Sequence, residues 1–157
     1  MTEPCTLIIF GATGNLAQLK LLPALYHLEV AGLLPAGLRI VCSGRSQYSQ
    51  ETWSVRVHEI LSQHARDPLS TAHCDAFDRR IHYFRGDLSE ADTFRQLAEL
   101  LSEPGFPDNQ VFYISLPPST YGSVIESLQT RGMLVENSAW RRVVIEKPFG
   151  SSLHGAQ

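Results

Sequence analysis

The N-terminal stretch TLIIFGATGNLAQ, residues 6–18, restricts the possible folds more than any other part of the chain. Its first five residues are apolar or β-branched, as in a strand that is buried on both faces of a parallel sheet. Two glycines three positions apart follow, and apolar residues then recur with helical spacing. A buried strand, a tight turn and a helix start in this order are typical of a βαβ unit, so we expect an α/β fold.

The turn within this stretch has the composition of a phosphate-binding loop. Gly11 can adopt a positive φ at the end of the strand, Gly14 leaves no Cβ between backbone and ligand, and Ala17 lets the helix pack closely on the strand. The first N–H groups of the helix and its positive dipole end then favour an anion above the turn. Because the spacing is G-x-x-G-x-x-A rather than G-x-G-x-x-G, an ordinary strand-to-helix connection stays possible for the turn taken alone.

Strand and helix patterns alternate along the rest of the chain. Further strands are predicted at residues 38–42, 81–85, 111–115 and 143–146, and helices from Asn15 with an interruption at Pro23, at 50–69, between Pro68 and Phe77, at 89–101 and at 121–131. This alternation predicts a doubly wound parallel sheet (Rossmann) with three layers and five or more strands, in the order 3-2-1-4-5. Two prolines follow the fourth strand, and the isomer of each X-Pro bond is left open.

The end of the second predicted strand indicates which dinucleotide binds. An acidic residue there bonds the ribose 2′-hydroxyl of NAD, whereas a nearby arginine accommodates the 2′-phosphate of NADP. This strand end carries no acid, and Arg45, with Ser46 and Ser43 as hydroxyl donors, favours NADP; a solvated loop arginine is the alternative. After the third strand, the backbone of Asp87 and Leu88 is placed to meet the adenine, although Asp87 also suits a simple turn or cap.

Composition and charge narrow the functional classes. The 157 residues fit one domain of dinucleotide-binding type, 1–157. The net charge of -3 gives no general basic field, so we expect no nucleic-acid partner. No apolar run approaches the roughly 18 residues of a membrane span and no secretory signal is present, so we expect no membrane partner and a cytoplasmic location. The three cysteines have no metal-ligand spacing, which predicts free thiols and no metal.

Five motifs taken together resemble the coenzyme domain of glucose-6-phosphate dehydrogenase. They are GATGNLA after the first strand, KLLPALYHLEVAGLLP in the first helix, SGRS after the second strand, FYISLPP at the fourth and RRVVIEKPFG at the fifth. They occur in order over essentially the whole chain, and IEKPFG and KLLPALY are more specific than the glycines. The resemblance implies NADP-linked oxidation of glucose 6-phosphate to 6-phosphogluconolactone, in the pentose phosphate pathway.

The same resemblance implies roles for single residues. Arg45 is similar in place to the arginine that holds the 2′-phosphate, Tyr113 matches the tyrosine of the family's F-Y-x-x-x-P-P motif, and Lys147 matches the E-K-P lysine that contacts substrate and coenzyme. The predicted cofactor-binding residues are Gly11, Ala12, Thr13, Gly14, Asn15, Leu16, Arg45, Asp87, Leu88, Tyr113 and Lys147, and Lys147 is also the predicted substrate-binding residue. We expect the full-length protein to be a homo-oligomer.

Three features depart from the family's pattern. Asn15 stands where the family usually has Asp, and Gln18 and Leu19 replace a basic pair, which removes positive charge near the coenzyme phosphates. The chain also stops at Gln157, before the family's R-I-D-H-Y-L-G-K motif and its histidine base. Because hydride transfer from C1 needs a base for the hydroxyl proton, we expect no catalytic residue in this chain and no turnover by the chain alone.

Two other interpretations stay open at this point. A short-chain-dehydrogenase relative would explain FGATGNLA and GDLSEADTF, but no tyrosine has a lysine four positions later, as the Y-x-x-x-K motif of that family requires. A non-catalytic module that senses NADP or serves as a scaffold would need no substrate domain. Sequence downstream of residue 157 would separate the module from the enzyme.

Overall fold

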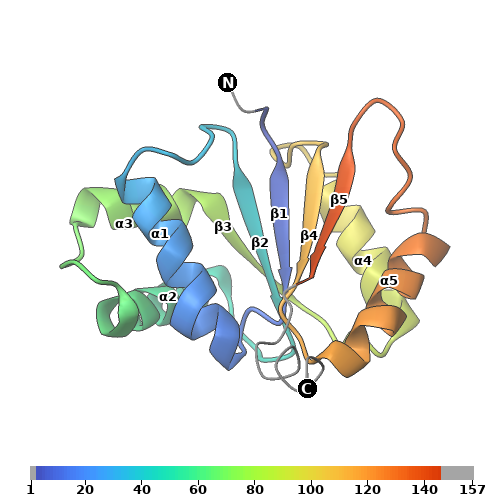
Figure 1. Cartoon of the computed structure of the whole chain (residues 1–157), viewed down its shortest axis with the longest axis horizontal. Coiled ribbons are helices and arrows are strands. Elements are labelled where there is room, and N and C mark those ends of the chain that lie inside the picture. The colour runs from blue at the N-terminus through green and yellow to red at the C-terminus, as the bar shows by residue number, and fades with distance from the viewer. Residues whose placement is uncertain (1–2, 146–157) are drawn as a thin grey trace, which may run out of the picture.

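The computed structural model describes residues 3–145, and Figure 1 shows how its helices and strands are arranged. The strands are β1 (Thr6–Phe10), β2 (Arg39–Gly44), β3 (Ile81–Arg85), β4 (Gln110–Ile114) and β5 (Arg141–Ile145). The α-helices are α1 (Leu22–Val30), α2 (Gln50–His64), α3 (Thr71–Arg80), α4 (Ala91–Leu101) and α5 (Tyr121–Thr130). A π-helical turn (Ala17–Leu21) precedes α1, and a 3₁₀ turn (Pro118–Thr120) precedes α5.

The five strands of the described chain form one parallel sheet in the order β3-β2-β1-β4-β5, which confirms the predicted order. Ile9 of the central strand β1 is in register with Cys42 of β2 and with Tyr113 of β4. Figure 1 shows α1, α2 and α3 on one side of the sheet and α4 and α5 on the other, so the fold has three layers. The strand order reverses between β1 and β4, and ligands of open α/β sheets bind at this point.

The central strand β1 is buried on both faces of the sheet, and its alternate side chains enter two different cores. Ile9 belongs to the core beneath α1, α2 and α3, together with Tyr26 and Trp53. Ile8 and Phe10 belong to the core beneath α4 and α5. These five side chains are at most 1% exposed. The unbroken apolar sequence of the first strand follows from this burial on both sides.

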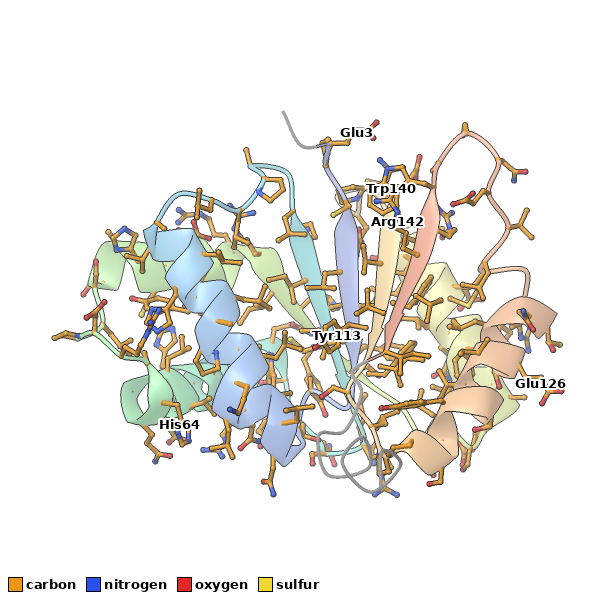
Figure 2. The ribbon with its side chains drawn as sticks, in the orientation of Figure 1. Glu3, His64, Tyr113, Glu126, Trp140 and Arg142 are labelled. Carbon is orange, nitrogen blue, oxygen red and sulfur yellow. The ribbon has the colours of Figure 1, made fainter. Side chains whose placement is uncertain are left out.

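Polar contacts join β1 and β5 at the N-terminal edge of the sheet. The Nε1 of Trp140 donates a hydrogen bond to the Oε1 of Glu3 at 3.1 Å, and the guanidinium of Arg142 lies 4.2 Å from the centroid of the Trp140 ring. Figure 2 shows these three side chains together at that edge. They lie at the starts of the strands, so the opposite edge, where the strands end, carries the turn between β1 and the first helix.

The first helix is irregular next to the proline at which the sequence predicts an interruption. In the π-helical turn, the N–H of Leu22 donates to the carbonyl of Ala17, and α1 begins with Pro23 in its first turn. Pro23 has no N–H to donate to a carbonyl of the preceding turn, which agrees with the change to π-helical spacing directly before it. The interruption is therefore a change in hydrogen-bond spacing, and the chain stays helical through it.

The segment between β2 and β3 divides differently from the prediction. The helix α2 ends at His64 instead of continuing to residue 69, and α3 runs to Arg80, directly before β3, instead of ending near Phe77. The hydroxyls of Ser49 and Thr52 each accept the other's backbone N–H, which fixes the start of α2 as a capping box. The hydrophobic spacing alone did not locate these ends, because apolar residues continue through the loop.

The structure also describes the prolines and cysteines that were noted in the sequence. All peptide bonds in residues 3–145 are trans, including those before Pro117 and Pro118. Cys42 and Cys74 are buried, Cys5 is half-buried, and all three are free thiols. In the described part of the chain no helix is long and apolar enough to span a membrane, and no three histidine, cysteine or acidic side chains lie where they could hold a metal ion together.

Candidate functional site

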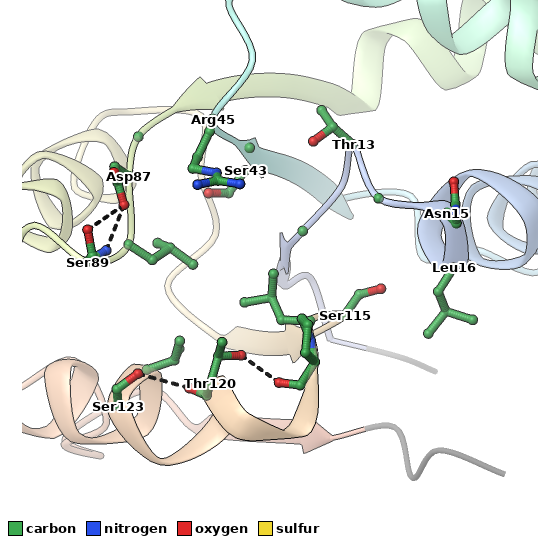
Figure 3. A pocket seen from close by; sticks show the side chains of 18 residues that line it. Thr13, Asn15, Leu16, Ser43, Arg45, Asp87, Ser89, Ser115, Thr120 and Ser123 are labelled. Atoms are coloured by element: carbon green, nitrogen blue, oxygen red, sulfur yellow. Dashed lines mark hydrogen bonds between the residues drawn. The ribbon is translucent and has the colours of Figure 1, made fainter. Parts of the chain in front are cut away.

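A cavity of about 690 Å³ lies at the C-terminal edge of the sheet, over the point where the strand order reverses. It is enclosed by the ends of β1, β2, β3 and β4 and by the start of α5, and Figure 3 shows the side chains that line it. The lining residues are Gly11, Thr13, Gly14, Asn15, Leu16, Ser43, Gly44, Arg45, Gly86, Asp87, Leu88, Ser89, Ser115, Leu116, Pro117, Thr120, Ser123 and Val124. This is the place and size of a small-molecule site in a doubly wound fold.

Most of the predicted cofactor-binding residues meet in this cavity, namely Gly11, Thr13, Gly14, Asn15, Leu16, Arg45, Asp87 and Leu88. Ala12 does not line it, because its side chain is fully buried in the core beneath α1, α2 and α3. Tyr113 does not line it either and is half-buried on β4, near the middle of the sheet in Figure 2. Lys147 lies outside the described residues.

The turn after β1 is held in place by β2 and by the end of β4. The carbonyl of Ser43 accepts the N–H groups of Gly11 and Ala12 at 3.1 and 3.0 Å, and the carbonyl of Gly11 accepts the N–H of Gly14 at 3.0 Å. Gly11 has a φ of 87°, as predicted, and a Cβ at this position would collide with the carbonyl oxygen of Ser115. Only glycine therefore fits this turn without strain.

The first helical turn presents backbone donors to the cavity. The first intrahelical bond runs from the N–H of Gln18 to the carbonyl of Gly14 at 3.1 Å, so Asn15 lies inside the first helical turn. Within residues 3–145, the N–H groups of Thr13, Asn15 and Leu16 donate no hydrogen bond. Unpaired N–H groups at a helix N-terminus bind anions such as phosphate.

A polar chain links this turn to α2. The side-chain amide of Gln18 donates to the carbonyl of Thr13 at 3.0 Å, and its oxygen accepts a hydrogen bond from Arg56 at 3.1 Å. Arg56 also pairs with Glu59 at 3.3 Å on the surface of α2. Gln18 carries no charge itself, but it places a guanidinium beside the turn. Sequence reasoning missed Arg56, because it is 38 residues away from Gln18 and only the fold brings the two together.

Arg45 and Asp87 follow β2 and β3 and lie on the same side of the cavity (Figure 3). Asp87 accepts hydrogen bonds from the hydroxyl and the N–H of Ser89 at 2.7 and 2.9 Å, and these bonds, with the nearby Arg45 charge, lower the pKa of Asp87 below its usual value. Its carbonyl accepts the Thr93 hydroxyl at 2.6 Å. Arg45 is exposed, and among the described residues its guanidinium forms no hydrogen bond or ion pair. A charged, planar donor is therefore left for a ligand.

The connection from β4 to α5 contributes lining residues that sequence reasoning missed. Ser115, Leu116 and Pro117 follow the strand, and Thr120 and Ser123 lie at the start of α5. The strand end was recognisable from the two prolines, but nothing in the local pattern shows which of the following side chains face the cavity. The position of β4 beside β1 decides this, because it places the segment against the turn at Gly11.

Two buried hydroxyls in the cavity wall support its assignment as a site for a polar ligand. Among the described residues, the side-chain oxygens of Ser43 and Ser115 have no hydrogen-bond partner, although the two residues are only 1% and 8% exposed. A buried hydroxyl without a partner costs about 1–3 kcal/mol, so such groups are rare unless a ligand or water satisfies them. Together with the open N–H groups and the free guanidinium, they fit a dinucleotide with several phosphate and hydroxyl groups.

Comparison with known families decides between the two dehydrogenase families that the sequence left open. The family described as "Glucose-6-phosphate dehydrogenase, NAD binding domain" matches residues 8–157. The chain belongs to the glucose-6-phosphate dehydrogenase family. It is the dinucleotide-binding domain of that family, and a short-chain-dehydrogenase relationship is no longer needed to explain the glycine turn.

Relatives of this glucose-6-phosphate dehydrogenase domain are longer than the chain. The glucose-6-phosphate 1-dehydrogenase of Treponema pallidum is 38% identical over 162 residues, which cover 98% of this chain and 31% of that protein. Glucose-6-phosphate 1-dehydrogenase 2 of Mycobacterium tuberculosis is 36% identical over 159 residues, with the same two coverages of 98% and 31%. The chain thus spans about a third of the length of these relatives.

Two solved structures have the same fold as this chain. The X-ray structure of glucose-6-phosphate 1-dehydrogenase from Mycobacterium avium superimposes with a TM-score of 0.80 at 27% identity. The match covers 94% of this chain and 31% of the Mycobacterium avium chain. A glucose-6-phosphate dehydrogenase in complex with its substrate glucose-6-phosphate superimposes with a TM-score of 0.76 at 29% identity, with coverages of 94% and 31%. The likeness is confined to the matched third of these enzymes.

Proposed function

We propose that this chain is the coenzyme-binding part of an NADP-dependent glucose-6-phosphate 1-dehydrogenase, which oxidises glucose 6-phosphate to 6-phosphogluconolactone in the pentose phosphate pathway. The family supports the reaction class. The observation that carries the choice of NADP is the unpaired, exposed guanidinium of Arg45 at the end of β2. An arginine at this place suits a 2′-phosphate, whereas NAD sites use an acid there.

Each part of the cavity has a task in this proposal. The open N–H groups of Thr13, Asn15 and Leu16 bind the pyrophosphate at the positive end of the helix. Arg45 binds the 2′-phosphate, and the buried hydroxyl of Ser43 lies on the same side to donate a hydrogen bond to the adenosine half. The bound coenzyme supplies the hydride acceptor. Lys147 holds glucose 6-phosphate beside it, a role that rests on the E-K-P resemblance alone.

We further propose that the chain alone binds coenzyme without oxidising substrate. The described histidines, His27, His58, His64, His73 and His82, do not line the cavity, so none of them is placed to accept the hydroxyl proton. A positioned base contributes about 10²- to 10⁴-fold to such a reaction. The free thiols agree with a reducing, cytoplasmic location. A homo-oligomer is expected of the full-length enzyme.

Titration of the chain with NADP and with NAD, by isothermal calorimetry, tests the proposal. NADP should bind more tightly, and Arg45→Ala should lower NADP affinity by about 10- to 100-fold while leaving NAD affinity nearly unchanged, because only NADP carries the 2′-phosphate. Arg79→Ala, which removes an exposed arginine at the end of α3, is the matched control and should change neither affinity. An equal loss of affinity for NADP and NAD in Arg45→Ala would show that Arg45 does not bind the 2′-phosphate.

A further inference from the structure

The hydroxyl of Ser115 has no task in the site as described so far. The residue is 8% exposed, it lines the cavity, and its side-chain oxygen has no hydrogen-bond partner in the described part of the chain. The two hydroxyls beyond it are already used: the hydroxyl of Thr120 donates to the carbonyl of Pro117 at 2.7 Å, and that of Ser123 donates to the carbonyl of Thr120 at 3.1 Å. Ser115 is therefore the available hydroxyl on this side of the described cavity.

The place of Ser115 in the sheet defines what it can reach. Its N–H donates to the carbonyl of Phe10 at 2.9 Å, so it adjoins the last residue of β1, and its carbonyl lies directly beneath Gly11. β4 lies on the opposite side of β1 from β2 and β3. Figure 3 accordingly shows Ser115 across the cavity from Arg45 and Asp87.

A dinucleotide in such a crevice extends across the point of strand reversal, with its pyrophosphate on the turn after β1. If the 2′-phosphate is held by Arg45 beside β2, the adenosine half lies over β2 and β3, and the other half must lie over β4. The groups that reach Ser115 are then those of the nicotinamide riboside half, whose ribose hydroxyls and phosphate oxygens accept hydrogen bonds from a serine.

We propose that the hydroxyl of Ser115 hydrogen-bonds the nicotinamide riboside half of the coenzyme and so fixes that half over the end of β4. This inference rests on the proposed coenzyme function, because it uses Arg45 to orient the dinucleotide. It assigns Ser115 a binding role that is separate from the 2′-phosphate contact. A serine that serves the ligand and not the fold explains why its buried hydroxyl has no partner within the described protein.

Two ligands allow the two halves of the site to be tested separately. NADP contains both halves, whereas 2′,5′-ADP contains only the adenosine half with the 2′-phosphate. Ser115→Ala should weaken NADP binding by about 3- to 10-fold, the value of one neutral hydrogen bond, and leave 2′,5′-ADP binding unchanged. Ser102→Ala, which removes an exposed hydroxyl that does not line the cavity, is the matched control and should bind both ligands like the wild type.

Thermal unfolding of the ligand-free chain supplies the second measurement. Ser115→Ala should not lower the melting temperature, because the hydroxyl bonds no other group within residues 3–145. A lowered melting temperature, wild-type affinity for NADP, or equal weakening of NADP and 2′,5′-ADP would each overturn the inference. Absence of NADP binding by the wild-type chain would instead overturn the proposed function, so the two failures are distinguishable.

Discussion

Replacing Gly11 with alanine should destabilise the whole domain. The backbone here has a φ of 87°, a conformation that costs a residue with a Cβ about 1–2 kcal/mol. The new Cβ would also collide with the backbone oxygen of Ser115 and lie 2.8 Å from the Cδ2 of Leu116, and displacing packed atoms costs about 1–3 kcal/mol more. The expected loss is about 2–5 kcal/mol, or roughly 4 to 20 °C in melting temperature for a domain of this size.

Gly14→Ala is the matched control for Gly11→Ala. Gly14 has no positive φ, and a Cβ there would lie 3.2 Å from the carbonyl oxygen of Gly11, which can move slightly. Its loss in stability should be about 1 kcal/mol or less, while NADP binding weakens because Gly14 lines the cavity. Urea and thermal unfolding of both variants measure the difference. A Gly11→Ala protein within about 0.5 kcal/mol of the wild type would refute the account of this turn.

Two further variants test the charge near the turn and the burial of a thiol in the core. Arg56→Ala should weaken NADP and NAD binding equally, by about 2- to 5-fold, because its charge lies near the turn on which the proposal places the pyrophosphate of both coenzymes. Weaker binding of NADP alone in the same titration would contradict this. Burial raises the pKa of the Cys42 thiol from 9.0 to about 12, so between these pH values the unfolded chain loses a proton that the folded chain keeps. The free energy of unfolding should therefore fall as pH rises through this window, by up to about 1.4 kcal/mol per pH unit from this group. Urea unfolding at pH 8 and pH 10 should show a smaller fall in Cys42→Ala than in the wild type. An equal fall in both proteins would exclude the thiol as the cause.

The framework of the fold was predictable because local pattern and topology agree. The apolar runs of β1 and β2 are buried on both faces of the sheet, and the alternation of strands and helices allows few parallel arrangements. The places of Gly11 and Arg45 were predictable for a related reason, since each stands at the C-terminal end of a strand and these ends meet at one edge of a parallel sheet. The expected site residues at these ends accordingly meet in one cavity.

The parts that sequence reasoning missed depend on contacts between distant segments. Arg56 reaches the turn only because α2 packs beside the first helix, and Ser115 faces the cavity only because β4 lies next to β1. That the Ser115 hydroxyl lacks a partner is a property of its surroundings and leaves no trace in the local sequence. Ala12 was predicted to bind the cofactor because it belongs to the glycine turn, but its side chain packs in the core.

The central claim is that an NADP molecule binds across the C-terminal edge of this sheet with its pyrophosphate on the turn after β1. The ¹H–¹⁵N spectrum of the chain during an NADP titration tests it directly, because each amide reports its own surroundings. The account predicts the largest shifts at Thr13, Asn15 and Leu16, whose N–H groups are open among the described residues. Shifts gathered instead around Trp140 and Arg142 at the other edge, or none at the turn at saturating NADP, would contradict it.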